Sequence, residues 1–173
     1  VYPLVTVRSQ GSSLWDVDGH RYVDITNGFG MILFGHNPDF IHDAVARQLQ
    51  AGYEIGPQTP LAGEVAAALC EMVGMERAAF CGTGSEAVTA ALRVARTVTG
   101  RDKVVIFNGA YHGIFDEVLV RPLRAASGQV PRSAPIAPGI PASMADNVIV
   151  LDYGSDVALR TIEQLGPQLA AVM

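Results

Sequence analysis

The spacing of hydrophobic residues divides the chain into a short opening part and a longer alternating part. In the opening part, residues 13–17 and 21–25 flank Asp18-Gly19, a frequent turn between antiparallel strands. This arrangement predicts a β-hairpin at the start of the chain, with Trp15 and Tyr22 packed on it.

Two helix patterns follow the hairpin. We expect Asn37 to cap the first helix, with Pro38 at its first position and Gly52 at its end. The second helix is expected to begin at Thr59 and to end before Gly74. Each helix has an apolar stripe predicted to be buried, which consists of Ile41, Ala44, Val45 and Leu49 in the first and of Leu61, Val65, Ala68, Leu69 and Met72 in the second.

Strands and helices alternate in the longer part. The expected strands are 78–81, 103–107, 118–121, 147–151 and 169–173, and the expected helices are 85–98 and 156–165. Such alternation predicts an α/β fold with a mostly parallel sheet flanked by helices. Residues 124–145 are rich in Ala, Pro, Ser and Gly and are expected to form a long loop.

The segment after the first of these strands has the composition of a phosphate-binding loop. Gly82 and Gly84 allow a sharp turn and a close approach to a ligand. The following helix offers free N–H groups and the positive end of its dipole, which suit a phosphate dianion. Thr83 and Ser85 add hydroxyl donors, so Thr83, Gly84 and Ser85 are candidate phosphate-binding residues.

Two other interpretations of this loop are open. Thr83 and Glu86 match a capping box, which would stabilise the helix without any ligand. Gly82, Gly84 and Ala87 also fit a loose dinucleotide-binding pattern, which requires an acidic residue at the end of the next strand. Asn108 stands there instead, and this weakens the dinucleotide interpretation.

Tyr111-His112-Gly113 follows the next strand, at the edge of the sheet where ligands gather in open α/β folds. We expect Tyr111 to stack on a flat cofactor ring and His112 to contact the cofactor, although either residue could simply hold the loop. Together the two segments suggest a site for a flat, phosphorylated cofactor.

Four sequence blocks, which follow one another in the expected order along the chain, resemble those of a known enzyme family. Gly84-Ser85-Glu86-Ala87 and Tyr111-His112-Gly113 resemble the class III, fold type I pyridoxal-phosphate aminotransferases. The upstream blocks 14–24 and 35–38 match the N-terminal part of that family. Residues 29–36 and 54–58 look most like glutamate-1-semialdehyde aminomutases and the aminotransferase domains of hybrid polyketide–nonribosomal peptide synthetases.

The resemblance implies a function and a domain organisation. It implies pyridoxal 5′-phosphate as cofactor, an amino donor, and a ketone or aldehyde acceptor that could be tethered to a carrier protein. An aminomutase and a non-catalytic cofactor-binding or dimerisation module are the alternatives. We expect residues 1–55 to belong to a small domain and residues 56–173 to begin the large cofactor-binding domain. A homodimer is implied by the resemblance alone.

The family's catalytic residues are not expected within this chain. Its Schiff-base lysine should lie beyond Met173, as should the aspartate that pairs with the pyridinium nitrogen, so the chain is expected to be the N-terminal part of a longer enzyme and inactive alone. Lys103 is the sole lysine, and we interpret it as a solvated residue at the start of a strand. The resemblance also implies that Phe29 lies near the substrate, with Asn27 lining the same pocket. Phe29 could equally be a core residue in a glycine-rich turn.

Composition narrows the remaining possibilities. The net charge of −5 argues against a nucleic acid or an anionic membrane as partner. No apolar run reaches transmembrane length, and no signal peptide opens the chain. Cys70 and Cys81 have no framework spacing, which favours free thiols in a cytoplasmic protein. No spacing of cysteine and histidine indicates a metal site.

Overall fold

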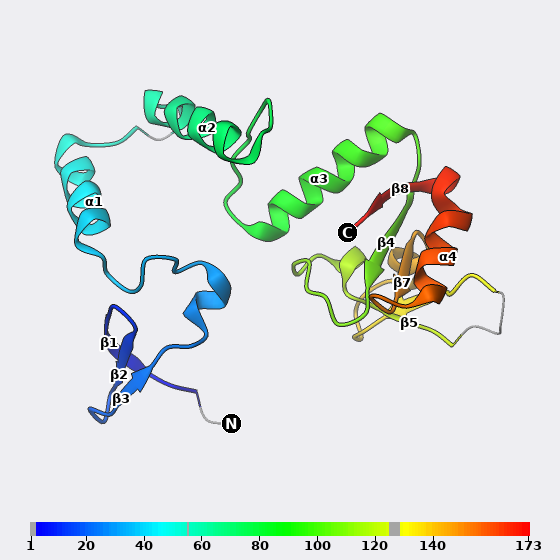
Figure 1. Ribbon diagram of the computed structural model, residues 1–173, viewed down its shortest axis with the longest axis horizontal. Helices are drawn as coiled ribbons and strands as arrows, with labels where there is room; N and C mark the ends of the chain where they lie inside the picture. Colours follow the sequence, from blue (N-terminus) through cyan, green and yellow to red (C-terminus); the bar gives the residue numbers. More distant parts are fainter. Residues whose placement is uncertain (1–2, 55, 125–128) are drawn as a thin grey trace. The chain divides into compact units, whose positions relative to one another are not determined.

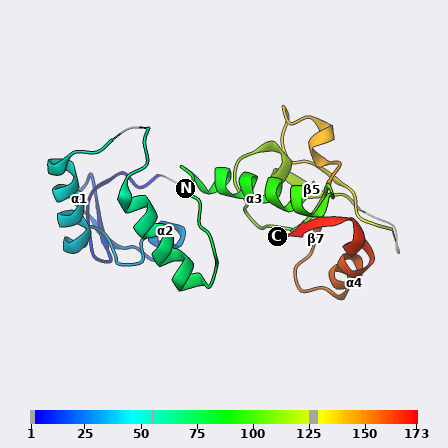
Figure 2. The same cartoon turned by 90° about the horizontal axis from the view of Figure 1, so that it is seen from above.

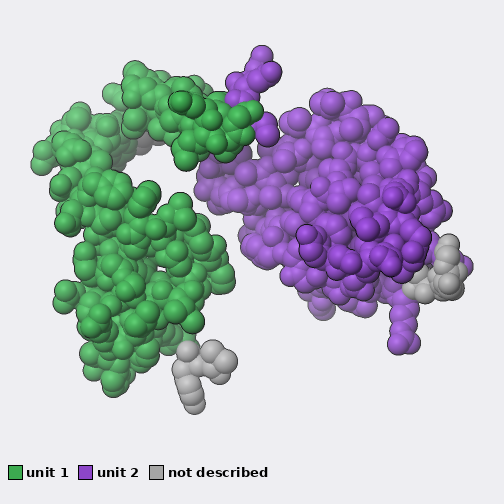
Figure 3. Space-filling model, in the orientation of Figure 1, with its two compact units in different colours: residues 1–74 green, residues 75–173 purple. Residues whose placement is uncertain are grey.

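The computed structural model describes residues 3–54, 56–124 and 129–173. These residues form two compact units, residues 1–74 and 75–173, which Figure 3 shows in different colours. The predicted boundary between the small and large domains at 55/56 remains a prediction. The two compact units are defined by their internal contacts, and such units need not coincide with the domains of the family. Ile55 and residues 125–128, which fall in predicted segments, lie outside the described residues.

The first unit begins with a three-stranded antiparallel sheet. Its strands are β1 (Thr6–Gln10), β2 (Ser13–Asp16) and β3 (Arg21–Val23), in the order β1-β2-β3 (Figure 1). The predicted hairpin is confirmed, and the buried carboxylate of Asp16 fixes its turn. Asp16 Oδ1 accepts the backbone N–H groups of Asp18 and His20 at 3.0 and 2.8 Å.

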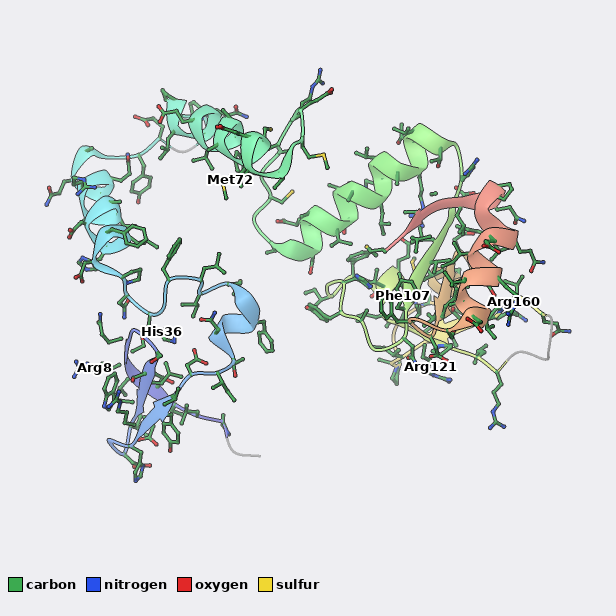
Figure 4. All side chains as sticks on the ribbon, in the orientation of Figure 1. Arg8, His36, Met72, Phe107, Arg121 and Arg160 are labelled. Carbon is green, nitrogen blue, oxygen red and sulfur yellow. The ribbon has the colours of Figure 1, made fainter. Side chains whose placement is uncertain are left out.

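The aromatic residues of the hairpin have polar neighbours. The Trp15 ring lies under the guanidinium groups of Arg8 and Arg21, at 4.6 and 5.7 Å from the ring centroid. Tyr22 donates its hydroxyl proton to Asp16 at 2.8 Å. Figure 4 labels Arg8 on this sheet. Both aromatic side chains therefore contribute to the hairpin, as the sequence indicates.

Helices α1 (Asp39–Ala51) and α2 (Pro60–Val73) follow a short 3-10 segment, η1 (Asn27–Gly30). The ends of both helices at Gly52 and Gly74 are confirmed. The predicted cap of α1 is wrong, because Pro38 occupies the N-cap position. Asn37 adopts a left-handed φ of +50° and donates its side-chain amide to the Ser9 carbonyl at 2.8 Å. Its side chain therefore ties the chain to β1.

The predicted burial of the two helix stripes is wrong for the described structure. No residue of α1 or α2 is buried. Ile41 is 42 % exposed and Met72 is 81 % exposed. An amphipathic stripe becomes buried only where a second apolar surface covers it, and the described residues of the first unit do not bury these stripes.

The second unit is built on a parallel sheet. Its strands β4 (Lys103–Phe107), β7 (Val148–Leu151) and β8 (Leu169–Val172) have the order β7-β4-β8, with Val104 opposite Val148 and Val105 opposite Val172. Helix α4 (Asp156–Leu165) and the short η4 (Gly166–Gln168) connect β7 to β8. The predicted parallel α/β arrangement of this part is confirmed.

Alternate residues of β4 face two different cores. Val104 and Ile106 pack with Leu92 of helix α3 (Gly84–Thr99), whereas Val105 packs with Ala158 of α4. The two helices thus lie on opposite faces of the sheet (Figures 1 and 2). This packing holds α3 against the face of the sheet that carries Val104 and Ile106.

Three local predictions in this unit are wrong or incomplete. Residues 78–81 form no strand, because no described strand lies beside them to share hydrogen bonds. The predicted strand 118–121 is replaced by η2 (Asp116–Val118) and then β5 (Val120–Pro122). The predicted loop 124–145 contains β6 (Ser133–Pro135), which pairs with β5, and η3 (Ala142–Ala145).

Candidate functional site

The candidate site begins at the N-terminus of α3, where the predicted capping box is present. Thr83 Oγ1 accepts the Glu86 N–H at 3.2 Å, and the Glu86 carboxylate accepts the Thr83 N–H at 2.8 Å. The first turn is therefore held by two hydrogen bonds of its own. The cap occupies two of the donors at this end of the helix.

Two further donors at the same helix end have no partner among the described residues. The N–H groups of Gly84 and Ser85 open the first turn, where an α-helix supplies no acceptor of its own. A Cβ built on Gly84 would meet no atom within 4 Å. The helix thus offers two N–H groups, a positive dipole end and open space for an anion.

The loop after β4 is held close to this helix end. Gly113 has a left-handed φ of +116°, and a Cβ at this position would lie 2.6 Å from Ser85 Oγ and 3.0 Å from Ser85 Cα. Only glycine tolerates both the conformation and the close approach. The Ile114 N–H also donates to Ser85 Oγ at 3.1 Å. Because the oxygen accepts this bond, the hydroxyl proton of Ser85 remains available to a ligand.

These segments enclose a pocket of about 370 Å³. Its lining residues are Thr83, Gly84, Ser85, Val88, Tyr111, His112 and Gly113. Tyr111 is 77 % exposed, so its side chain is accessible to a ligand. His112 Nε2 is buried and has no hydrogen-bond partner within the described residues. The structure therefore brings together all five residues that the sequence proposed for the cofactor.

Asn27 and Phe29 lie in the first unit, so the structure gives no placement of them relative to this pocket. Both have left-handed φ angles, +51° and +56°, with Gly28 between them at +56°. Phe29 is 95 % exposed. A non-glycine residue such as Phe29 stores backbone strain in this conformation, and such strain is common in segments that contact ligands. Their role in a substrate pocket remains a prediction.

Asp24 supports this strained segment, and sequence analysis did not identify it. Its Oδ1 accepts the N–H groups of Asn27 and Thr26 at 3.0 and 2.9 Å. Its Oδ2 lies 2.8 Å from Nε2 of His36, which Figure 4 labels. Because the Asn27 N–H and the His36 ring both favour the carboxylate, the pKa of Asp24 lies below its usual value. His36 thus has a structural role in this loop.

Lys103 lies at the opposite end of β4 from the pocket. It is the first residue of the strand, and its Nζ donates to Gln168 Oε1 at 2.6 Å. Phe107, labelled in Figure 4, is the last residue of the same strand and precedes the Tyr111 loop. The interpretation of Lys103 as a residue at the start of a strand is confirmed.

One cluster of possible metal ligands occurs in the hairpin. Asp16, Asp18 and His20 bring one ligand atom each within 4.8 Å of one another. Asp16 already accepts hydrogen bonds from the backbone and from Tyr22 and contacts the His20 ring at 3.2 Å. Within the described chain this cluster is accounted for by its role in the hairpin turn.

The whole chain matches a known class of protein. The family model Aminotransferase class-III matches residues 1–173, and the chain therefore belongs to this family. A glutamate-1-semialdehyde 2,1-aminomutase from Chloroflexus aurantiacus is 39 % identical over 173 residues, covering 99 % of this chain and 38 % of the relative. The chain thus spans well under half the length of this curated relative.

Solved structures give the same result. An omega-transaminase from Sphaerobacter thermophilus matches with a TM-score of 0.88 and 32 % identity, over 99 % of this chain and 40 % of that protein. A structure described as a transaminase with PLP bound matches with a TM-score of 0.85 and 30 % identity, over the same shares. The predicted fold, that of fold type I pyridoxal-phosphate enzymes, is confirmed for the part that the chain spans. Within the described residues, no helix has the length and apolar character required to cross a membrane.

Proposed function

We propose that this chain supplies the phosphate cradle and the ring-stacking residue of an enzyme that transfers amino groups with pyridoxal 5′-phosphate. The observation that carries the proposal is the pocket at the start of α3. Unpartnered N–H groups, an exposed aromatic ring and an unpartnered histidine nitrogen meet there. The relative described with PLP bound supports the identity of the ligand.

The residues present fit this cofactor. The N–H groups of Gly84 and Ser85 and the Ser85 hydroxyl would hold the phosphate, and the absence of a side chain on Gly84 leaves room for it. The Tyr111 ring would cover one face of the pyridine ring. The buried Nε2 of His112 would form a hydrogen bond with the cofactor or its substrate. These four residues bind and orient the group.

When bound, the cofactor supplies an electron sink for chemistry at the amino-bearing carbon. The residues of this chain do not supply the proton-transferring lysine. Lys103 is at the far end of β4 and already donates to Gln168. The lysine and the pyridinium-pairing aspartate are therefore proposed to come from residues after Met173 in the whole enzyme.

The identity of the amino-group acceptor, and whether the enzyme is a transaminase or an aminomutase, are determined by the whole protein. A glutamate-1-semialdehyde-type aminomutase is the second candidate, because a relative with that name is 39 % identical to the chain. A carbonyl substrate bound as a β-ketoacyl thioester to a carrier protein is a further candidate, supported by the sequence blocks at residues 29–36 and 54–58. We place the enzyme in the cytoplasm and expect it to act as a homodimer.

The experiment uses the natural full-length protein that contains this segment. Its absorbance spectrum is recorded during titration with pyridoxal 5′-phosphate, and a ¹⁵N-labelled amino donor is then supplied with carbonyl acceptors. Label in a second molecule identifies a transaminase, whereas conversion of glutamate 1-semialdehyde without a donor identifies an aminomutase. Failure of the protein to bind the cofactor would refute the proposal and leave a non-catalytic module.

A further inference from the structure

Two contacts with α3 hold the loop that carries Tyr111 and His112. The first is at Ser85, which packs against Gly113 and accepts the Ile114 N–H at 3.1 Å. The second is at Arg96, which pairs with Glu117 just after the loop. Ser85 and Arg96 are separated by about 16 Å along the helix, at roughly 1.5 Å per residue. The loop is thus anchored near both ends of one rigid element.

Arg96 makes more than one contact at its end of the helix. Its Nη1 donates to Glu117 Oε2 at 3.1 Å, and its Nη2 donates to the second carboxylate oxygen. Its Nε donates to the Asp102 carbonyl at 3.0 Å, immediately before β4. A two-point guanidinium–carboxylate contact fixes orientation as well as distance. One side chain therefore links the entry to β4 with the exit from the Tyr111 loop.

The pair is well shielded from solvent. The side chains of Arg96 and Glu117 are 24 % and 23 % exposed. The hydrogen bonds that Arg96 donates to the Glu117 carboxylate raise the pKa of Arg96 above its usual value. Partly buried, geometrically fixed ion pairs hold their partners more firmly than exposed ones. Glu117 lies three residues after Ile114, in the 3-10 helix η2 that follows the loop.

We infer that Arg96 and Glu117 are positioning residues for the cofactor. They set where the Tyr111 ring and the His112 nitrogen stand relative to the free N–H groups of α3, although neither residue lines the pocket. The inference rests on the proposed function. Without the pair, the loop keeps its Ser85 contact with α3 and the packing of Phe115 against the core. It loses the contact that joins its end to Arg96, and the Tyr111 ring then samples more orientations. Cofactor binding must then fix the loop, and the entropy lost in doing so weakens the affinity relative to the wild-type protein.

The test measures cofactor affinity and cofactor orientation in the full-length protein. Glu117→Gln removes the charge of the carboxylate. Arg96→Lys keeps the positive charge but loses the two-point contact. Asp116→Asn is the matched control, since it removes a negative charge from the adjacent residue, whose side chain makes no hydrogen bond in the described structure. Dissociation constants are measured at 25 °C, and circular dichroism of the bound cofactor reports the orientation of its ring.

We expect Glu117→Gln and Arg96→Lys to weaken pyridoxal 5′-phosphate binding by about three- to tenfold and to change the dichroism of the bound cofactor. Asp116→Asn should bind as the wild type does. If Glu117→Gln fails to fold, Arg96→Lys supplies the test. A lower melting temperature with unchanged affinity and dichroism would overturn the inference. Absence of cofactor binding by the wild type would instead refute the proposed function.

Discussion

Gly84 allows ligand binding to be separated from protein stability. Its φ lies outside the left-handed region, and a Cβ on this residue would meet no atom within 4 Å. A Cβ here therefore creates no clash within the described protein. Gly84→Ala should even favour the helix slightly, by at most about 1 kcal/mol. Any loss of cofactor affinity must then come from the ligand itself.

The expected size of that loss follows from how a phosphate reaches the helix. It must approach the Gly84 and Ser85 N–H groups to about 2.9 Å to form hydrogen bonds. The branched side chain of valine would occupy the open space beside Gly84 through which we propose that the phosphate approaches. We expect Gly84→Val to weaken pyridoxal 5′-phosphate binding by well over tenfold, which corresponds to more than ~1.4 kcal/mol.

The assay compares two valine variants of the full-length protein. Gly63→Val is the control, because Gly63 is also a helical glycine with no atom within 4 Å of its Cβ position. Thermal unfolding of the apoprotein should be similar for the two variants. Cofactor titration should show a large loss for Gly84→Val only. Equal affinities for the two variants would show that the phosphate does not bind at the start of α3.

Three further substitutions or treatments test other parts of the structure. Tyr111→Ala should weaken cofactor binding by roughly 1–3 kcal/mol and Tyr111→Phe by much less; equal titration results for the two would mean that the ring does not stack. Asp24 has a lowered pKa, mainly through the Asn27 N–H, so its stabilising effect is present above the usual value of 3.8 and is lost as pH falls through the lowered value. Asp24→Asn should therefore lower the melting temperature at neutral pH and flatten its decline in acid, whereas an unchanged decline would contradict this assignment. Borohydride reduction with pyridoxal 5′-phosphate, followed by peptide mapping, should give no stoichiometric label at Lys103, because β4 spans about 16 Å and a lysine side chain reaches only about 6 Å; such a label would refute the strand assignment.

The elements that the sequence predicted correctly are those with local causes. The capping box at Thr83 is made by residues three positions apart, and Gly74 ends α2 through its own left-handed backbone. Helix 156–165 begins at Ser155, whose hydroxyl accepts the Ala158 N–H at 3.1 Å. Each of these features depends on a few neighbouring residues, so the sequence alone is sufficient to place them.

The predictions that failed depend on distant surfaces. Residues 78–81 are as apolar as a buried strand, but a strand exists only with a hydrogen-bonded neighbour. The stripe that includes Ile41 is regular, but burial requires a second apolar surface. Strand β6 was missed because Pro135 and its neighbours have weak strand preference and form a strand only by pairing with β5. The periodicity of a sequence identifies the apolar face of a helix or strand, but burial of that face depends on residues elsewhere in the fold.

The candidate site was predictable in its composition but not in its supports. The sequence proposed both Ser85 and Tyr111 for one site, although strand 78–81, on which the position of Ser85 at the sheet edge rested, does not form in the described structure. The hydrogen bond from Ile114 to Ser85 could not be derived, because it depends on the path of the loop. The Arg96–Glu117 pair joins residues 21 positions apart, and many other charged pairs were equally compatible with the sequence.

The spacing of residues on α3 explains how one helix can carry both supports. Leu92 is buried against the sheet, and it lies seven residues after Ser85 and four before Arg96. At 3.6 residues per turn, positions separated by seven and eleven residues fall on the same face of a helix. Burial of Leu92 therefore turns both Ser85 and Arg96 toward the strand and its following loop. The hydrophobic effect that packs α3 on the sheet thus also aligns the polar contacts that position Tyr111 and His112.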